Sequence, residues 1–165
     1  MITQENLKSI LHYSPETGLF TRLVNRQCVR AGDIAGYQTE YGYIRIGIDG
    51  KNHRAHRLAW LYMTGSWPSE QIDHINGIRS DNRWENLREA THGQNKMNSL
   101  SPLNKCGLKG VTRNGNNWMA QIRVQKQRIY LGTFASKEDA HAAYCAAADK
   151  HFGDFANHGS TGVSR

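Results

Sequence analysis

Apolar residues near the N-terminus recur at helical spacing, and the pattern then changes to one typical of strands. Residues 2–12 predict a short amphipathic helix with Thr3 as its N-cap. Its apolar positions are Ile2, Leu7, Ile10 and Leu11. The Ser14-Pro15 pair ends this helix. Residues 18–56 are rich in strand-forming residues and include an Asp49-Gly50 turn, so they predict a small antiparallel sheet.

The middle of the chain starts with a second helical pattern and then becomes polar. Residues 57–65 predict a short helix that ends at Gly65. Residues 71–98 are rich in asparagine and contain too few apolar residues to serve only as a core element. Within them we predict a strand at 72–75, a turn at Asn76-Gly77, and the approach to and body of a helix over Asn86 to Asn98. A hairpin and a helix would then lie together around one ion. The composition of this stretch therefore requires a functional explanation.

The last third of the chain predicts a sheet followed by a helix. Residues 109–134 contain two or three short strands separated by turns, the first at Asn114-Gly115. An alanine-rich helix follows, with Ser136 as N-cap and a stop at Gly153. The expected fold class is α+β, with a small N-terminal sheet and helix, a central domain, and a three-stranded antiparallel sheet packed on one helix. The expected parts are an N-terminal accessory region (1–40), a central domain (41–98), a linker (99–108), a C-terminal domain (109–157) and a flexible tail (158–165).

The charge of the chain indicates the kind of binding partner, and its cysteine content indicates the cellular compartment. Lys and Arg number 21 against 14 Asp and Glu, a net charge of +7 with a pI near 9.5, which favours a polyanionic partner. The three cysteines, Cys28, Cys106 and Cys145, form no C-x-x-C pair and support neither a disulfide framework nor a zinc ribbon. No apolar run approaches the roughly 18 residues that a membrane span needs, and no signal-peptide pattern begins the chain. We expect a cytoplasmic protein with no membrane partner.

Candidate chemistry is concentrated in the polar central stretch. Asp73 and His74 are adjacent, and Asn86 and Asn95 follow them. The carboxylate of Asp73 and the amide oxygen of Asn95 are ligands that a hard metal ion prefers. Imidazole titrates near neutrality, so His74 is a candidate general base for a water attacking phosphorus. From the residues alone, a turn or cap role is favoured over a ligand role for each asparagine.

The motif IDHINGIRSDNRWENLREAT, followed by QNKMN, resembles the HNH (ββα-metal) nucleases found in phage and group I intron homing endonucleases. With the preceding AHRLAWLYMTG, the resemblance covers roughly residues 41–98. It implies that Asp73 and Asn95 hold one Mg²⁺ or Mn²⁺ ion, that His74 activates water, and that Asn86 fixes the loop. Asn95 stands where the final histidine of the motif often stands, which favours hard ions over zinc.

Further residues near the motif have two interpretations each. Arg79, Arg83 and Arg88 either neutralise flanking phosphates or form a solvated charged face. His53 and His56 lie in the segment before the second predicted helix, and we interpret them as structural rather than catalytic. The resemblance also implies a phage-infected bacterial host and products with 5′-phosphate and 3′-hydroxyl ends.

Residues 109–157 resemble the DNA-binding domain of plant Apetala and ethylene-response factors, through GV, W-x-A-x-I-R, YLGTF and A-x-AY-x-x-AA. The resemblance implies that the sheet lies in the DNA major groove. The DNA-contacting residues that it implies are Arg113, Trp118, Arg123, Arg128 and Tyr130. Strand alternation puts Trp118 on the face of Ala120, so Trp118 is also interpretable as a core residue, whereas Arg123 faces outward. Each arginine contacts either a guanine or a phosphate.

Two functional hypotheses follow. The first is a metal-dependent DNA endonuclease of the phage homing type that acts as a monomer and nicks one strand of double-stranded DNA without a small-molecule cofactor. The second is a sequence-specific DNA-binding protein with an inactive nuclease centre. The intact set of Asp73, His74, Asn86 and Asn95 favours the first hypothesis.

Overall fold

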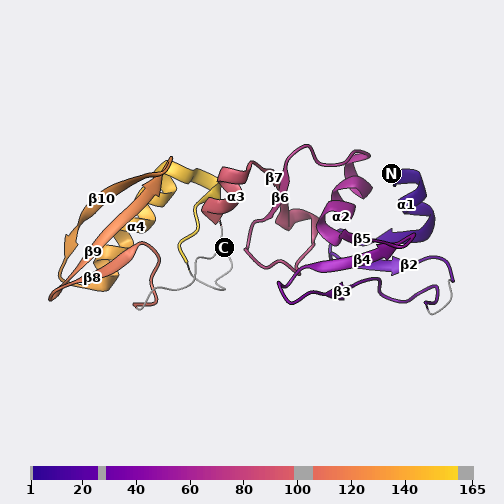
Figure 1. The fold of residues 1–165 in the computed structure, drawn as a ribbon, viewed down its shortest axis with the longest axis horizontal. Helices are drawn as coiled ribbons and strands as arrows, with labels where there is room; N and C mark the ends of the chain where they lie inside the picture. The colour runs from indigo at the N-terminus through magenta and orange to yellow at the C-terminus, as the bar shows by residue number, and fades with distance from the viewer. Residues whose placement is uncertain (1, 26–28, 99–105, 160–165) are drawn as a thin grey trace. The chain divides into compact units, whose positions relative to one another are not determined.

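The computed structural model describes residues 2–25, 29–98 and 106–159, and the chain divides into two compact units, Met1–His92 and Gly93–Arg165 (Figure 1). Each unit combines small antiparallel sheets with short helices, which confirms the expected α+β fold class. Most of the expected linker and tail, together with Cys28, lies outside the described residues. No helix among the residues that the structure describes is long and apolar enough to cross a membrane.

The N-terminal helix α1 (Gln4–Ile10) is shorter than its apolar pattern indicates. Its N-cap is Thr3, as expected, because the Thr3 hydroxyl accepts a hydrogen bond from the backbone N–H of Asn6. Leu11 is extended and begins strand β1 (Leu11–Tyr13), which pairs with β2 (Phe20–Arg22). In β1 the buried residues Leu11 and Tyr13 flank exposed His12, so the apolar pattern has already changed to the period of a strand.

The sheet expected over residues 18–56 is in fact two sheets, and the single-sheet prediction was wrong. One is the hairpin of β1 and β2, and the other has the order β3 (Tyr37–Gln38), β4 (Ile44–Ile48), β5 (Lys51–Arg54). The predicted Asp49-Gly50 turn joins β4 to β5, with both residues at positive φ. The physical reason for the split is that β2 pairs with β1, a segment that its apolar spacing assigned to a helix.

One hydrophobic core holds the first unit together. Helix α2 (Ala55–Thr64) ends at Gly65, which adopts the left-handed conformation expected of a C-cap. Its Leu58 and Leu61 pack in one buried cluster with Leu7 of α1 and Ile46 of β4. The described part of residues 1–40 therefore contributes to the same core as the segments that follow it.

The polar central stretch forms a hairpin followed by a short helix, as expected. Strand β6 (Gln71–His74) pairs with β7 (Leu87–Ala90), and the 3₁₀ turn η1 (Trp84–Asn86) precedes β7. Helix α3 (His92–Asn98) ends at Asn98 as expected, and strand β7 occupies the approach to it after Asn86. Leu87 and Ala90 are buried in β7 while Glu89 between them is exposed, which is the alternation of a strand.

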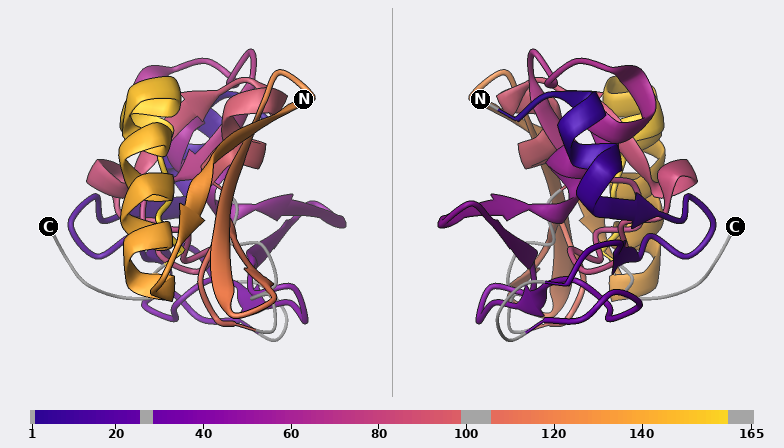
Figure 2. Two further views of the ribbon diagram at one scale, coloured as in Figure 1. Left: turned by 90° about the vertical axis from the view of Figure 1, so that its left-hand side faces the viewer. Right: turned by 90° about the vertical axis from the view of Figure 1, so that its right-hand side faces the viewer.

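The second unit is a three-stranded sheet with one helix on one face (Figure 2). Its strands are β8 (Val111–Asn114), β9 (Asn117–Val124) and β10 (Gln127–Phe134), in the order β10-β9-β8. Helix α4 (Lys137–Phe152), capped by Ser136 as expected, is followed by η2 (Gly153–Phe155). A Cβ at Gly110 would lie 1.9 Å from the Tyr144 ring, so only glycine allows α4 to pack this closely.

Candidate active site

The β6–β7 hairpin places an acid and a histidine side by side at its buried end. Asp73 and His74 are the last two residues of β6 and pair in register with Arg88 and Leu87. Both are polar and yet only 4% exposed. The strand is held in this position because Ile72 belongs to the hydrophobic core. Buried groups of this kind require partners, and the partners define the site.

Asp73 is held in an ion pair with Arg88 across the hairpin. Its Oδ2 atom accepts hydrogen bonds from Nε and Nη2 of Arg88 at 3.0 and 2.8 Å. The side chain of Arg88 is 17% exposed and that of Asp73 is 5% exposed, so water screens this pair little. The guanidinium thus compensates the charge of a buried carboxylate.

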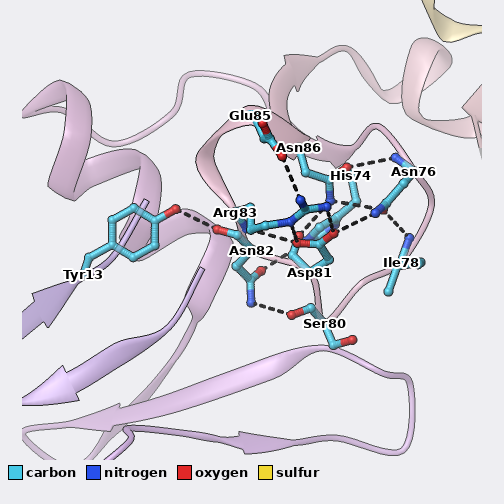
Figure 3. Close-up of polar contacts among 10 residues, drawn as sticks. All are labelled: Tyr13, His74, Asn76, Ile78, Ser80, Asp81, Asn82, Arg83, Glu85 and Asn86. Atoms are coloured by element: carbon cyan, nitrogen blue, oxygen red, sulfur yellow. Dashed lines mark hydrogen bonds and ion pairs between the residues drawn. The ribbon is translucent and has the colours of Figure 1, made fainter. Parts of the chain in front are cut away.

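His74 is in contact with aromatic and amide groups. Its Nε2 atom lies 3.2 Å from Oδ1 of Asn82 (Figure 3). Its ring meets that of His56 nearly edge to face, with 5.0 Å between centroids, and lies 6.2 Å from that of Tyr43. Burial lowers the pKa of His74, although the hydrogen bond with Asn82 and the charges of nearby carboxylates oppose this shift. At neutral pH, His74 is therefore in the unprotonated form that a general base requires.

His56, from the first turn of α2, is a second buried histidine beside His74. It is 3% exposed, and its Nδ1 atom has no hydrogen-bond partner among the described residues. Burial and the positive charges of neighbouring groups lower the pKa of His56 to about 3. His56 is consequently neutral at any pH near neutrality and packs against His74 as an aromatic ring.

Asn86 closes the loop that joins the two strands (Figure 3). Its Oδ1 accepts the backbone N–H of Asn76 at 3.0 Å, while its Nδ2 donates to Oδ1 of Asn76 and to the carbonyl of Asp81. Asp81 in turn accepts hydrogen bonds from Asn76 and Arg83, and its bond with Arg83 is the main reason why the pKa of Asp81 is lowered. The loop conformation is thus fixed by hydrogen bonds that its own side chains make with one another and with its backbone.

The three arginines of the central stretch differ in their surroundings. Arg83 pairs with Asp81 and Glu85, and Arg88 pairs with Asp73. Arg79 is exposed, donates to the carbonyl of Tyr41 and lies 5.1 Å from the centre of the Tyr43 ring. Of these three side chains, Arg79 is the one that is exposed without a carboxylate in an ion pair.

Asn95 lies on α3, in the second unit, whereas Asp73 belongs to the first unit. The C-terminal end of α3 is attached to its own unit, because Asn157 donates to the carbonyl of Asn98 at 2.7 Å and Lys109 donates to that of Met97. The pairing of Asp73 with Asn95 around a metal ion stays a prediction.

The chemistry of the donor set fits a hard ion. Among the described residues, no group of three His, Cys, Asp or Glu side chains is arranged to hold a metal. Mg²⁺ often uses only one or two carboxylates and takes its other ligands from water and substrate phosphates. Asp73, with one amide oxygen, would supply such a partial set.

In the second unit, the sheet presents three of the predicted DNA-contacting residues on one face. Arg123 and Arg128 are directly paired in register, and Tyr130 is paired with Gln121, so these side chains share the face opposite α4. All three are exposed. Arg113 is paired with Trp118 and so belongs to the other face, where Trp118 packs against the buried cluster around Ala120.

Two residues that hold His74 in place were not anticipated from the sequence. Asn82 is 2% exposed and contacts the His74 ring, and Tyr13 donates to the Asn82 carbonyl at 2.7 Å from 69 positions away. Asn82 stands in a run of polar loop residues and carried no signal of its own. Tyr13 lies between the predicted N-terminal helix and the Ser14-Pro15 pair, a position that says nothing about its hydroxyl group.

Residues 53–97 match the family model described as HNH endonuclease. The matched segment runs from the end of β5 through α2 and the β6–β7 hairpin into α3, and it includes Asp73, His74, Asn86 and Asn95. The resemblance to HNH endonucleases that the central motif indicated is therefore confirmed for this segment. The β6–β7 hairpin thus lies within the segment that is similar to HNH endonucleases.

Individual proteins resemble larger parts of the chain. It is 30% identical over 122 residues to the uncharacterized HNH endonuclease L560 of Acanthamoeba polyphaga mimivirus, covering 73% of this chain and 64% of that protein. It is 36% identical over 61 residues to an ethylene-responsive transcription factor-like protein of Arabidopsis thaliana, covering 37% of this chain and 26% of the plant protein. The chain thus spans less than two thirds of the length of both relatives.

A solved structure also resembles part of the chain. It shows DNA binding and cleavage by the HNH homing endonuclease I-HmuI, and it is 26% identical to this chain. The match covers 54% of this chain and 51% of that chain, with a TM-score of 0.43.

Proposed function

We propose that this protein is a metal-dependent HNH endonuclease that hydrolyses a phosphodiester bond of double-stranded DNA. The observation that carries the proposal is the pair of buried side chains at the end of β6. Asp73 and His74 are both 4% exposed, and each is held by a polar partner, within a segment that matches the HNH endonuclease family. Burial of a carboxylate and an unprotonated imidazole next to each other is difficult to explain by stability alone.

In the proposed reaction, His74 takes a proton from a water molecule as the water oxygen attacks phosphorus. The bond between phosphorus and the 3′ oxygen breaks, and that oxygen takes up a proton, which leaves 5′-phosphate and 3′-hydroxyl ends. Asp73 and Asn95 would hold one Mg²⁺ or Mn²⁺ ion, and Asn86 would fix the loop. The ion, when bound, supplies positive charge that stabilises the developing charge on the phosphate and on the departing oxygen.

The second unit would bind and read the DNA. The net charge of +7 and the shared exposed face of Arg123, Arg128 and Tyr130 support this role. The similarity to an ethylene-responsive transcription factor-like protein also supports it. Arg79, Arg83 and Arg88 would add phosphate contacts around the cut, with exposed Arg79 the best placed, and Arg113 and Trp118 remain secondary candidates for contacts at the sheet.

A single active site per chain supports a monomer that nicks one strand. The similarity to a viral HNH endonuclease supports a phage homing-type enzyme that works in the cytoplasm of an infected host. Neither a membrane nor a small-molecule cofactor enters the proposed reaction.

The test is cleavage of supercoiled plasmid DNA by the wild-type protein and by His74→Ala in EDTA, Mg²⁺ and Mn²⁺. We expect nicked circles from the wild type with either metal and a loss of cutting in His74→Ala by roughly a hundredfold or more, with DNA binding retained. His12→Ala, which removes an exposed histidine from β1, is the matched control and should cut normally. Intact DNA in every lane, with binding retained, would instead identify a DNA-binding protein with an inactive nuclease centre.

A further inference from the structure

The side-chain amide of Asn82 determines which nitrogen of His74 carries the proton. The Nδ2 group of Asn82 donates to the Ser80 carbonyl at 3.2 Å, and a carbonyl can only accept. The other end of the amide, Oδ1, therefore faces Nε2 of His74 at 3.2 Å. Because this oxygen also can only accept, Nε2 must donate, and in the neutral ring the basic lone pair is then on Nδ1.

The backbone of Asn82 is in turn held by the β1–β2 hairpin. The Tyr13 hydroxyl, at the end of β1, donates to the Asn82 carbonyl at 2.7 Å (Figure 3). Tyr13 is 1% exposed and packs against Phe20 and Tyr62, with ring centroids 4.8 and 5.7 Å away. A rigid aromatic cluster thus fixes the position of the hydroxyl group.

The turn between β1 and β2 also packs against the backbone of residues 82–84. A Cβ atom at Gly18 would lie 2.4 Å from both the Arg83 nitrogen and the Asn82 carbonyl carbon. In addition, the backbone N–H of Trp84 donates to the Pro15 carbonyl at 2.9 Å. Three contacts from residues 13–18 therefore hold the segment 82–84, and this segment carries the amide that touches His74.

We propose that the β1–β2 hairpin is a brace for the general base: through Tyr13 and Gly18 it fixes Asn82, and Asn82 holds His74 with Nε2 protonated and Nδ1 as the proton acceptor. Asn82, Tyr13 and Gly18 are positioning residues, because they act on the reaction only through His74. The inference rests on the proposed function for its kinetic consequence. The assignment of the protonated nitrogen does not depend on activity.

The first measurement is the tautomer of His74 by long-range ¹H–¹⁵N correlation in the full-length protein, in EDTA at pH 8. The His74 signals are assigned by their loss in His74→Ala. We expect a protonated Nε2 in the wild type and in Asn82→Asp, which keeps an acceptor oxygen. We expect a mixture of tautomers in Asn82→Leu, which removes the acceptor at similar size. A wild-type ring with its proton on Nδ1 overturns the proposal.

The second measurement tests the hairpin with variants that do not touch His74. Tyr13→Phe removes one hydroxyl group, and Tyr62→Phe does the same to a ring of the same aromatic cluster. We expect Tyr13→Phe to shift the His74 tautomer towards a mixture. We also expect it to lower the single-turnover cutting rate at saturating DNA about tenfold to a hundredfold, with the Kd for DNA unchanged. Tyr62→Phe should match the wild type in both measurements.

A glycine pair provides an independent test of the same contact. Gly18 and Gly50 both have φ of +73°, so an alanine is equally strained at either position, but only at Gly18 does the added Cβ meet the loop backbone. We expect Gly18→Ala, but not Gly50→Ala, to slow cutting and to shift the His74 ring towards a mixture of tautomers.

If Tyr13→Phe and Gly18→Ala fold and behave like their controls, the proposal that the β1–β2 hairpin is a brace is overturned. If the tautomer responds as expected in a protein that cuts no DNA, the brace is supported and the proposed nuclease function fails.

Discussion

At the scale of single residues, the site keeps its ionisable groups buried in two different ways. Asp73 is charged and is compensated by the guanidinium of Arg88 at 2.8 Å. His74 and His56 are kept neutral by burial, which lowers the pKa of each. A negative charge and two unprotonated rings thus lie together under a covering of side chains. Such an arrangement is suited to bind a cation at the acid and to accept a proton at the base.

The ion pair between Asp73 and Arg88 leads to a prediction about metal binding. Arg88→Met should lower the free energy of unfolding by about 3–5 kcal/mol in EDTA, because it removes the guanidinium that is ion-paired with a buried carboxylate. Mg²⁺ should then raise the melting temperature more in Arg88→Met than in the wild type, because the ion can supply the missing positive charge. Thermal unfolding with and without Mg²⁺ measures both effects. Asp73→Asn is the control, and an equal Mg²⁺ response in that variant would contradict the prediction.

The low pKa of His56 leads to a prediction about stability and pH. The pKa of about 3 in the folded state lies below the ordinary 6.5, so between these values the unfolded chain binds a proton that the folded chain does not. Stability contributed by neutral His56 is therefore present at pH 7 and is lost as the pH falls, by about 2 kcal/mol at pH 5. His56→Phe, which does not titrate, should show a correspondingly smaller loss in urea unfolding at pH 7 and pH 5. His12→Phe, a change at an exposed histidine, should keep the wild-type dependence.

At the scale of elements, the hairpin loop is organised by side-chain hydrogen bonds that centre on Asn86. Removing this amide leaves the backbone N–H of Asn76 and the carbonyl of Asp81 without these partners. We predict that Asn86→Ala lowers the free energy of unfolding by about 1–3 kcal/mol and lowers the cutting rate, because the loop that carries Asn82 loses its shape. Chemical denaturation and single-turnover cleavage test this. Asn116→Ala, in the exposed β8–β9 turn, should change neither quantity.

Elements whose pattern is local could be predicted from the sequence. Thr3 and Ser136 cap their helices as expected, because a cap depends on residues within one turn. The alternation of Ala120 and Ile122 with Arg123 places the buried face of β9 correctly. The boundary between α1 and β1 could not be predicted, because Leu11 fits the apolar period of the helix and is assigned to a strand by its pairing with Arg22. Such pairing is a property of the folded chain and leaves no local signal.

The same distinction applies to the candidate site. Asp73, His74, Asn86 and Asn95 could be singled out because their spacing forms a motif, and the hairpin brings the first three into one unit. Asn82 and Tyr13 could not be found, because their roles depend on contacts across 8 and 69 positions. The ion pair of Arg88 was missed for a related reason. An arginine near a nuclease motif suggests a phosphate contact, and only the β6–β7 register shows that it faces Asp73.

At the scale of the whole molecule, the proposed general base and the proposed DNA-reading sheet belong to different units, so variants should separate their effects. We predict that Arg123→Ala and Arg128→Ala weaken DNA binding while the single-turnover rate at saturating DNA stays near that of the wild type. His74→Ala should instead lose cutting activity and keep the wild-type affinity for DNA.

If an arginine contacts a phosphate, its removal should reduce the slope of log Kd against log salt concentration by about 0.9, equally for all DNA sequences. If it contacts a guanine, its removal should cost about 1–3 kcal/mol on the preferred site alone. Lys150→Ala, the same change in charge on helix α4, should leave binding nearly unchanged because α4 covers the other face of the sheet. An equal loss of affinity in Lys150→Ala would mean that the sheet face is not the binding surface.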